Sequence, residues 1–251
     1  VPWAQDILDA IERGDIDLAD YKLDQWRLMH IGAQPVPPSL IKRWKKYFPN
    51  QKYDTNYGLS ESIGPGCVHL GVDNEHKMGA IGKAGFGWQT RIVDENRNDV
   101  KPGEVGELAV KGPGVMTAYY KDEKATAEVL EDGWLFTGDM AKRDAEGYYY
   151  ITGRKKRFLK MYGKRVNMDE IEQLLRGRYE GVEVACTGED DRMRIYMEGM
   201  DPASCEEAAK FLTEKTGLYP GGVRVLSIDK VPKNESGKTI YKELEKLPWN
   251  S

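Results

Sequence analysis

Short strand-like runs separated by tight turns fill one stretch of the chain and constrain its fold more than any other feature. Residues 88–93 and 107–111 are apolar enough to form strands, and polar turns follow them. A short helix is expected at 122–130, and two more strands flank the turn at 144–147. The pattern predicts a small β-rich subdomain over residues 83–153.

Helical periodicity dominates the sequence before this stretch. Apolar residues at 4, 7, 8 and 11 predict a helix that ends at Gly14. A strand is expected at 27–31, and a second helix is expected after Pro37-Pro38-Ser39, as far as the break at Pro49. These elements predict an α/β piece over residues 1–82.

Helices and strands also alternate over residues 158–251. Asn167 can cap one helix, and a second helix begins at Asp201-Pro202 and ends at Gly217. The strands of this region are expected at 182–187, 194–198 and 223–228. The pattern predicts a separate α+β domain, and the basic stretch 154–157, which has no apolar periodicity, is the expected hinge.

Composition and charge exclude several classes of protein. A net charge of -4 gives no basic field for nonspecific nucleic-acid binding. No run is long and apolar enough to span a bilayer, and the N-terminus has no signal-peptide pattern. The three cysteines are scattered and the three histidines stand apart, so no zinc-ligand spacing is present. We expect a reduced, cytoplasmic setting, with no transmembrane segment and no nucleic-acid partner.

The sequence Ser236-Gly237-Lys238-Thr239 looks like the end of a phosphate-binding P-loop. That motif needs a glycine five positions before Gly237, where this chain has Pro232, so the P-loop interpretation fails. Lys238 therefore lies on a turn whose backbone is made flexible by Gly237. Taken alone, the turn favours a solvated lysine over a functional one.

Three other groups of residues can bind a nucleotide but are ambiguous in isolation. The segment 57–61 contains an aromatic ring, a glycine, a hydroxyl and the Glu61 carboxylate. It is either a site that binds a nucleotide and Mg²⁺ or a turn at the end of a strand. Asp139, after Thr137-Gly138, can accept ribose hydroxyls or serve turn chemistry. The basic cluster at 153–160 is an anion clamp or a solvated linker.

The order and spacing of these groups resemble the adenylate-forming superfamily, which contains acyl-CoA synthetases and peptide-synthetase adenylation domains. The resemblance extends from Gly32 to Lys238. Its elements are Gly32-Ala33, Tyr57-Gly58-Leu59-Ser60-Glu61, Gly106-Glu107-Leu108, Lys111-Gly112-Pro113-Gly114, Thr137-Gly138-Asp139, Asp144-x-x-Gly147-Tyr148, Gly153-Arg154, Lys160-x-x-Gly163, Val166-x-x-x-Glu170-Ile171-Glu172 and Pro232-Lys233-x-x-x-Gly237-Lys238.

The resemblance implies the fold and the activity. It implies the C-terminal part of a large adenylate-forming domain, with an α/β piece and a β-rich subdomain, followed by a small mobile α+β domain. The implied reaction activates a carboxylic acid, fatty or aromatic, with ATP to give acyl-AMP and then transfers the acyl group to coenzyme A. ATP or AMP and Mg²⁺ are the implied cofactors. A long-chain acid would add peripheral contact with a membrane.

The resemblance also implies residue roles. Lys238 would act in adenylation, Lys160 would act when CoA attacks, Lys156 would be the hinge, and Gly163 would line the CoA tunnel. Glu61 would hold Mg²⁺. The implied nucleotide-binding residues are Gly32, Ala33, Tyr57, Gly58, Ser60, Asp139 and Arg154.

The sequence departs from the family pattern in three places. Ile31 stands where the family usually has glycine, which predicts a reshaped acyl pocket, and Tyr241 stands where arginine is usual. The family's Ser/Thr/Gly-rich phosphate loop would lie upstream of Gly32, where this chain has none. We therefore expect that the chain alone cannot form acyl-AMP from ATP. A carrier-protein-loading adenylation domain and a noncatalytic nucleotide-binding module are the alternatives.

Overall fold

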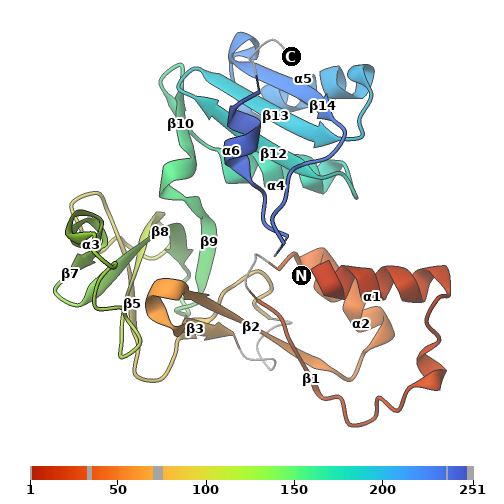
Figure 1. Cartoon of the computed structure of the whole chain (residues 1–251), viewed down its shortest axis with the longest axis horizontal. Helices are drawn as coiled ribbons and strands as arrows, with labels where there is room; N and C mark the ends of the chain where they lie inside the picture. The colour runs from red at the N-terminus through yellow and green to blue at the C-terminus, as the bar shows by residue number, and fades with distance from the viewer. Residues whose placement is uncertain (1, 33–35, 70–75, 236, 248–251) are drawn as a thin grey trace. The chain divides into compact units, whose positions relative to one another are not determined.

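The computed structural model describes residues 2–32, 36–69, 76–235 and 237–247. The chain divides into two compact units, Val1–Thr152 and Gly153–Ser251 (Figure 1). The division falls inside strand β9, Tyr149–Arg154, next to the basic stretch that the sequence predicts as a hinge. Within the described residues, no helix combines the length and the apolarity needed to cross a bilayer.

The first unit begins with two helices that cover a four-stranded sheet. Ala4 and Leu8 of one helix and Ile41 and Trp44 of the other are buried against Met29. The helical spacing of these apolar residues creates the buried face, and Gly14 ends the first helix with a φ of 79°. The elements are α1 (Pro2–Arg13), β1 (Leu28–His30), α2 (Pro38–Tyr47), β2 (Lys52–Leu59), β3 (Gly64–His69) and β4 (Lys83–Ala84).

Strands β1 and β2 are parallel, whereas β2, β3 and β4 are antiparallel neighbours in sequence order. The second sheet of this unit has the order β5-β6-β8-β7, and β9 pairs with β8. Its core contains Leu108, Val110 and Leu135. Its elements are β5 (Gln89–Val93), β6 (Gly106–Lys111), α3 (Glu123–Val129), β7 (Leu130–Glu131), β8 (Trp134–Arg143) and β9. This sheet accounts for most of the stretch in which a β-rich subdomain is predicted, and the separate subdomain stays a prediction.

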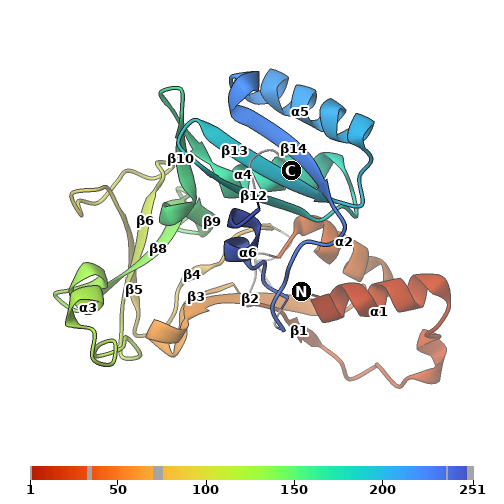
Figure 2. The same cartoon turned by 45° about the horizontal axis from the view of Figure 1, so that its top comes forward.

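The second unit has a three-stranded sheet with helices on both faces (Figures 1 and 2). Residues alternate along β12: Val184 and Cys186 join the core with α4 and α5, whereas Ala185 joins the core with α6. Strand β13 is antiparallel to β12 and parallel to β14. The elements are β10 (Phe158–Met161), β11 (Lys164–Asn167), α4 (Met168–Arg178), β12 (Val184–Glu189), β13 (Arg192–Glu198), α5 (Pro202–Thr216), β14 (Val223–Ile228) and α6 (Tyr241–Glu245).

Capping residues begin the two long helices of this unit as predicted. The Asn167 side chain accepts a hydrogen bond from the Asp169 backbone N–H at 3.0 Å, and Asp201 accepts one from Ser204 at 3.0 Å. Gly217 ends α5 in the left-handed conformation, with a φ of 65°. The β10–β11 hairpin was not predicted, because its residues show neither clear alternation nor a standard turn dipeptide.

Candidate functional site

Asp139 lies on a bulge of β8 that directs its side chain. The pairing of β6 with β8 shifts between Glu107 and Ala109, so Thr137 to Asp139 lie opposite a single residue. Gly138 has a φ of 72° and donates its N–H to Glu107 Oε1 at 3.0 Å. The glycine is required there because a side chain strains a left-handed backbone. The bulge therefore changes the direction in which the Asp139 side chain points, compared with a regular strand.

Asp139 and Tyr57, which are 82 positions apart in the sequence, are in direct contact. The Tyr57 hydroxyl donates a hydrogen bond to Asp139 Oδ2 at 2.6 Å, and Asp139 is only 5% exposed. Tyr57 also lies at a register shift, between β2 and β3 at Tyr57/Gly58. The structure thus brings two predicted nucleotide-binding segments together, and both lie where regular strand pairing is interrupted.

Glu61 follows in a single 3₁₀ turn, Ser60–Ser62, and is held by a distant loop. The Tyr119 hydroxyl donates to Glu61 Oε1 at 2.9 Å, and the Met116 N–H donates to the Glu61 carbonyl at 2.7 Å. Burial, followed by the hydrogen bond to Glu61, raises the pKa of Tyr119. The phenol therefore remains a donor at neutral pH. Ser60, the first residue of the turn, is exposed.

The donor set around Glu61 suits Mg²⁺ held together with a nucleotide. Within the described part of the chain, no group of three or more His, Cys, Asp or Glu side chains could enclose a metal ion. Mg²⁺ keeps several waters and is usually held by one or two carboxylates together with substrate phosphates. A single half-buried carboxylate beside the exposed Ser60 fits that arrangement.

Gly32 is placed by a close approach between β1 and β2. A Cβ atom there would lie 2.4 Å from Asn56 Oδ1, so a larger residue would require the Asn56 side chain to move. Ala33, predicted to lie beside it, is outside the described residues. Ile31 is 2% exposed and packs into the core beneath α1 and α2. The structure therefore gives Ile31 a packing role, and its effect on the shape of the acyl pocket stays a prediction.

Ile63, directly after the Glu61 turn, has an unfavourable backbone conformation. Its φ is 50°, which is rare for a β-branched residue, and its side chain is 85% exposed. The left-handed conformation costs about 1–2 kcal/mol for an L-residue other than glycine or asparagine. We expect Ile63→Asn to raise the free energy of unfolding by about 1 kcal/mol in urea titrations. Ile63→Val keeps the branch and is the control; equal stability of the two variants would contradict this explanation.

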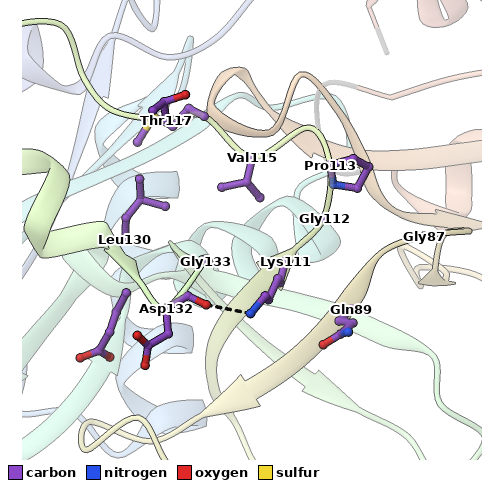
Figure 3. Close-up of a pocket in the computed structure, with 12 residues that line it drawn as sticks. Gly87, Gln89, Lys111, Gly112, Pro113, Val115, Thr117, Leu130, Asp132 and Gly133 are labelled. Carbon is purple, nitrogen blue, oxygen red and sulfur yellow. Dashed lines mark hydrogen bonds between the residues drawn. The ribbon is translucent and has the colours of Figure 1, made fainter.

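A cavity of about 580 Å³ lies beside this region but contains none of the predicted site residues (Figure 3). It opens between the 111–117 loop and the β7–β8 turn, where Lys111 Nζ donates to the Asp132 carbonyl at 2.8 Å. The Lys111-Gly112-Pro113-Gly114 motif forms part of its wall. Met116, further along the same loop, bonds to the Glu61 carbonyl. This support accounts for the Lys111-Gly112-Pro113-Gly114 motif without a ligand in the cavity.

Lys238 lies on a tight loop between β14 and α6 in the second unit. Its N–H donates to Asn234 Oδ1 at 2.9 Å, and the Asn234 N–H donates to the Lys238 carbonyl at 2.9 Å. Gly237 has a φ of 77°, while Ser236 lies outside the described residues. The Lys238 side chain is exposed at the end of this ordered turn.

Lys160 and Lys238 lie at opposite ends of the second unit. The Lys160 N–H bonds to Asp190, just after β12, whereas Lys233 of the Lys238 loop pairs with Glu183, just before β12. β12 has six residues, and at about 3.3 Å per residue its ends are about 20 Å apart. The β10–β11 hairpin and the loop before α6 are separated in this way in both views (Figures 1 and 2).

The basic stretch contains both exposed and buried side chains. Arg154 and Lys156 are exposed, as a hinge or linker requires, and the Arg154 backbone N–H bonds to Asp169 at 2.9 Å. Arg157 differs from the solvated-linker interpretation, because its side chain is only 11% exposed and is paired with Asp169 and Glu172. These carboxylates on α4, of which Glu172 is buried and Asp169 partly exposed, draw Arg157 into the second unit.

Two supporting residues were missed by the sequence analysis. Tyr119 holds Glu61, and Asn56 contacts Gly32. Neither has a local signal, because each acts through a contact with another strand or loop. Only the proximity of Asn56 to Tyr57 in the sequence could have pointed to it.

Residues 3–120 match the family model described as AMP-binding enzyme. Among similar proteins, 4-coumarate–CoA ligase-like 9 of Arabidopsis thaliana is 32% identical over 236 residues, which is 90% of this chain and 42% of that protein. Over residues 3–120 the chain is similar to AMP-binding enzymes. A long-chain-fatty-acid–CoA ligase of Salmonella typhimurium is 34% identical over 224 residues, which is 85% of this chain and 39% of that protein.

The chain spans about two fifths of the length of these curated relatives. Among solved structures, O-succinylbenzoate coenzyme A synthetase from Bacillus subtilis in complex with AMP matches with a TM-score of 0.75 and 24% identity. The match covers 97% of this chain and 54% of that one. The predicted fold class, a mixed α and β chain corresponding to part of an adenylate-forming enzyme, is confirmed.

Proposed function

We propose that this chain is part of an acid–thiol ligase that converts a carboxylic acid to acyl-AMP and passes the acyl group to coenzyme A. The main support is the contact between Tyr57 and Asp139, which joins two predicted nucleotide-binding segments. The similarity to a 4-coumarate–CoA ligase-like protein and to a long-chain-fatty-acid–CoA ligase favours an aromatic or fatty acid and CoA as the acceptor.

In this proposal the first unit binds the nucleotide. Asp139 would accept both ribose hydroxyls, and the Tyr57 hydroxyl would fix the orientation of its carboxylate. Tyr57 and Gly58 would line the adenine and acyl site, with Gly32 behind them. Ser60 would contact the α-phosphate.

Charge neutralisation is the main requirement of the first half-reaction, because both reactants are anionic. Glu61 would hold Mg²⁺, which supplies positive charge to the phosphates when it is bound. Lys238 would add a second positive charge at the carboxylate and α-phosphate, where charge develops. Arg154 would complete the ribose contacts from the second unit.

The second unit would supply a different lysine for each half-reaction. Lys238 and Lys160 lie at opposite ends of β12. Because these ends are about 20 Å apart, the two lysines cannot reach one carboxyl group in a single position of the unit. We therefore propose that the unit turns about Lys156 between the half-reactions. Gly163, next to Lys160, would leave room for the thiol of CoA.

The proposal predicts that binding of AMP depends on Asp139. We expect Asp139→Ala to weaken AMP binding by about tenfold, the effect of losing a charge-assisted hydrogen bond. Isothermal titration of the chain with AMP, and with a nonhydrolysable acyl-adenylate analogue, measures this loss. Lys111→Ala is the matched control, since Lys111 lines the separate cavity and should leave the affinity unchanged.

Three results would contradict parts of this proposal. Equal affinity of wild type and Asp139→Ala for AMP would remove Asp139 from the nucleotide site. Tight adenylate binding without thioester formation from acyl-AMP and CoA would favour the noncatalytic module. Transfer to a carrier-protein thiol but not to CoA would favour the peptide-synthetase type.

A further inference from the structure

Two residues with strained backbones meet beside Lys160. Tyr162 has a φ of 49° and Asp191 a φ of 63°, and the Tyr162 N–H donates to Asp191 Oδ1. Left-handed conformations are unfavourable for residues with a Cβ and persist only where the surrounding structure enforces them. The coincidence of two such residues in one contact indicates a geometric constraint at this point.

The first strained residue lies in the turn between β10 and β11. Met161 pairs with Lys164, so Tyr162-Gly163 is a two-residue hairpin turn, and Gly163 also has a positive φ, 85°. Such turns favour Asn-Gly, because both residues must be left-handed. Tyrosine at the first position is therefore a local cost that other contacts must offset.

The Asp190–Asp191 turn holds the backbone of Lys160 from both sides. Asp190 Oδ1 accepts the Lys160 N–H at 2.8 Å, and the Asp191 N–H donates to the Lys160 carbonyl at 2.9 Å. The Lys160 side chain is exposed. Its ammonium group therefore projects from a main chain that is fixed at both its donor and its acceptor.

A third segment closes around the same point. The Tyr219 ring packs edge-on against Tyr162 with centroids 4.9 Å apart, and Lys164 Nζ donates to the Gly217 carbonyl at 2.7 Å. A Cβ at Gly222 would lie 2.7 Å from the Tyr162 ring and 2.9 Å from the Asp191 carbonyl. Three chain segments thus enforce the strained turn.

We propose that Asp190 and Asp191 are positioning residues for Lys160 in the transfer of the acyl group to the thiol. This inference rests on the proposed function and adds the elements that aim the lysine. The carboxylates act through the main chain of the hairpin and do not contact the substrate. Adenylation, which would use Lys238 at the other end of β12, should not depend on them.

Amide hydrogen exchange on the 251-residue chain tests the positioning directly. We expect the Tyr162 amide to exchange about tenfold faster in Asp191→Ala and the Lys160 amide to do so in Asp190→Ala, because each variant removes a hydrogen bond to a charged group that is worth at least that factor. Asp191→Asn keeps an acceptor oxygen and should restore slow exchange. The amides of β13 should not change, nor should any amide in the control variant Glu214→Ala. Asp190→Ala removes the bond to the Lys160 N–H alone and gives the same test with less disturbance of the fold.

Thioester formation from a preformed acyl-adenylate and CoA tests the consequence. Asp191→Ala should lower kcat about tenfold and Asp191→Asn should not, while AMP affinity stays at the wild-type value. Unchanged exchange at Tyr162 in Asp191→Ala and at Lys160 in Asp190→Ala would overturn the positioning role, as would faster exchange with normal transfer. A wild-type chain that forms no thioester would contradict the proposed function and the catalytic consequence with it. Exchange would then still decide whether the turn holds Lys160.

Discussion

Replacement of Arg157 by alanine is expected to lower the free energy of unfolding of the second unit by about 3–5 kcal/mol, the cost of leaving a buried charge without its partner. Arg157 donates to Asp169 at 2.7 Å, to Glu172 and to the Cys186 carbonyl at 2.9 Å. Glu172 is nearly inaccessible, with a side chain 4% exposed. Urea titration followed by circular dichroism measures the loss.

Controls separate this buried pair from ordinary surface charge. Arg178→Ala breaks an exposed pair with Glu207 and should cost no more than about 1 kcal/mol. The double variant Arg157→Met, Glu172→Leu should recover much of the loss, because apolar side chains replace buried pairs well. A loss for Arg157→Ala no larger than that of Arg178→Ala would show that water screens the pair.

The loss in Arg157→Ala should also depend on pH. Burial raises the pKa of Glu172, and Arg157 opposes that rise. Without Arg157 the folded-state pKa rises further above the unfolded value, so the folded protein takes up a proton more readily. A raised carboxyl pKa favours the folded state at low pH, and this advantage is lost as pH increases through the folded pKa. The loss should therefore be smaller at pH 5 than at pH 7.

The same network places the proposed hinge on the N-terminal side of Arg157. The Arg157 guanidinium stacks on the Tyr241 ring at 3.8 Å, and the Tyr241 hydroxyl donates to Glu172 at 3.2 Å. Tyr241 begins α6, three residues after Lys238. Arg157 therefore moves with the Lys238 loop as one body, and the rotation that we propose must occur in residues before it.

The sequence predicted elements well where local periodicity determines them. The apolar residues of α1, α2 and α5 recur at helical spacing, so each helix has one apolar face that packs against the core. Gly14, Pro38 and Gly217 mark termini of these helices. The β10–β11 hairpin was missed because its turn is stabilised by Asp191 and Tyr219, not by its own dipeptide. Tertiary contacts outweigh turn propensity there.

The candidate site shows the same division. Turn chemistry alone gave Asp139 no special role, and its contact with Tyr57 depends on two irregular strand pairings that no local pattern reveals. The family resemblance predicted the residues because it reflects the folded arrangement. Arg157 was part of a cluster predicted to be an anion clamp or a solvated linker. Its ion pairs were not foreseen, since its partners Asp169 and Glu172 lie on a helix that starts after the hairpin.

The Lys111-Gly112-Pro113-Gly114 loop supports the Glu61 turn through a contact that only glycine allows. A Cβ at Gly114 would lie 2.3 Å from the Ser62 carbonyl oxygen and 3.1 Å from the Trp88 ring. We expect Gly114→Ala to lower the free energy of unfolding of the first unit by about 2–3 kcal/mol, as overpacking against the backbone does. The Met116 amide, which bonds to the Glu61 carbonyl, should lose protection from hydrogen exchange.

Gly64→Ala is the matched control for this prediction. Gly64 is close to the same turn, but a Cβ there would lie 3.9 Å from the Ser62 carbonyl, an ordinary contact distance. Its substitution should change stability by about 0.5 kcal/mol at most. If Gly114→Ala is no more harmful than Gly64→Ala, the loop can move away without cost and does not hold Glu61. If stability falls but Met116 stays protected, the strain is absorbed at Trp88, and Glu61 keeps its position without help from Gly114.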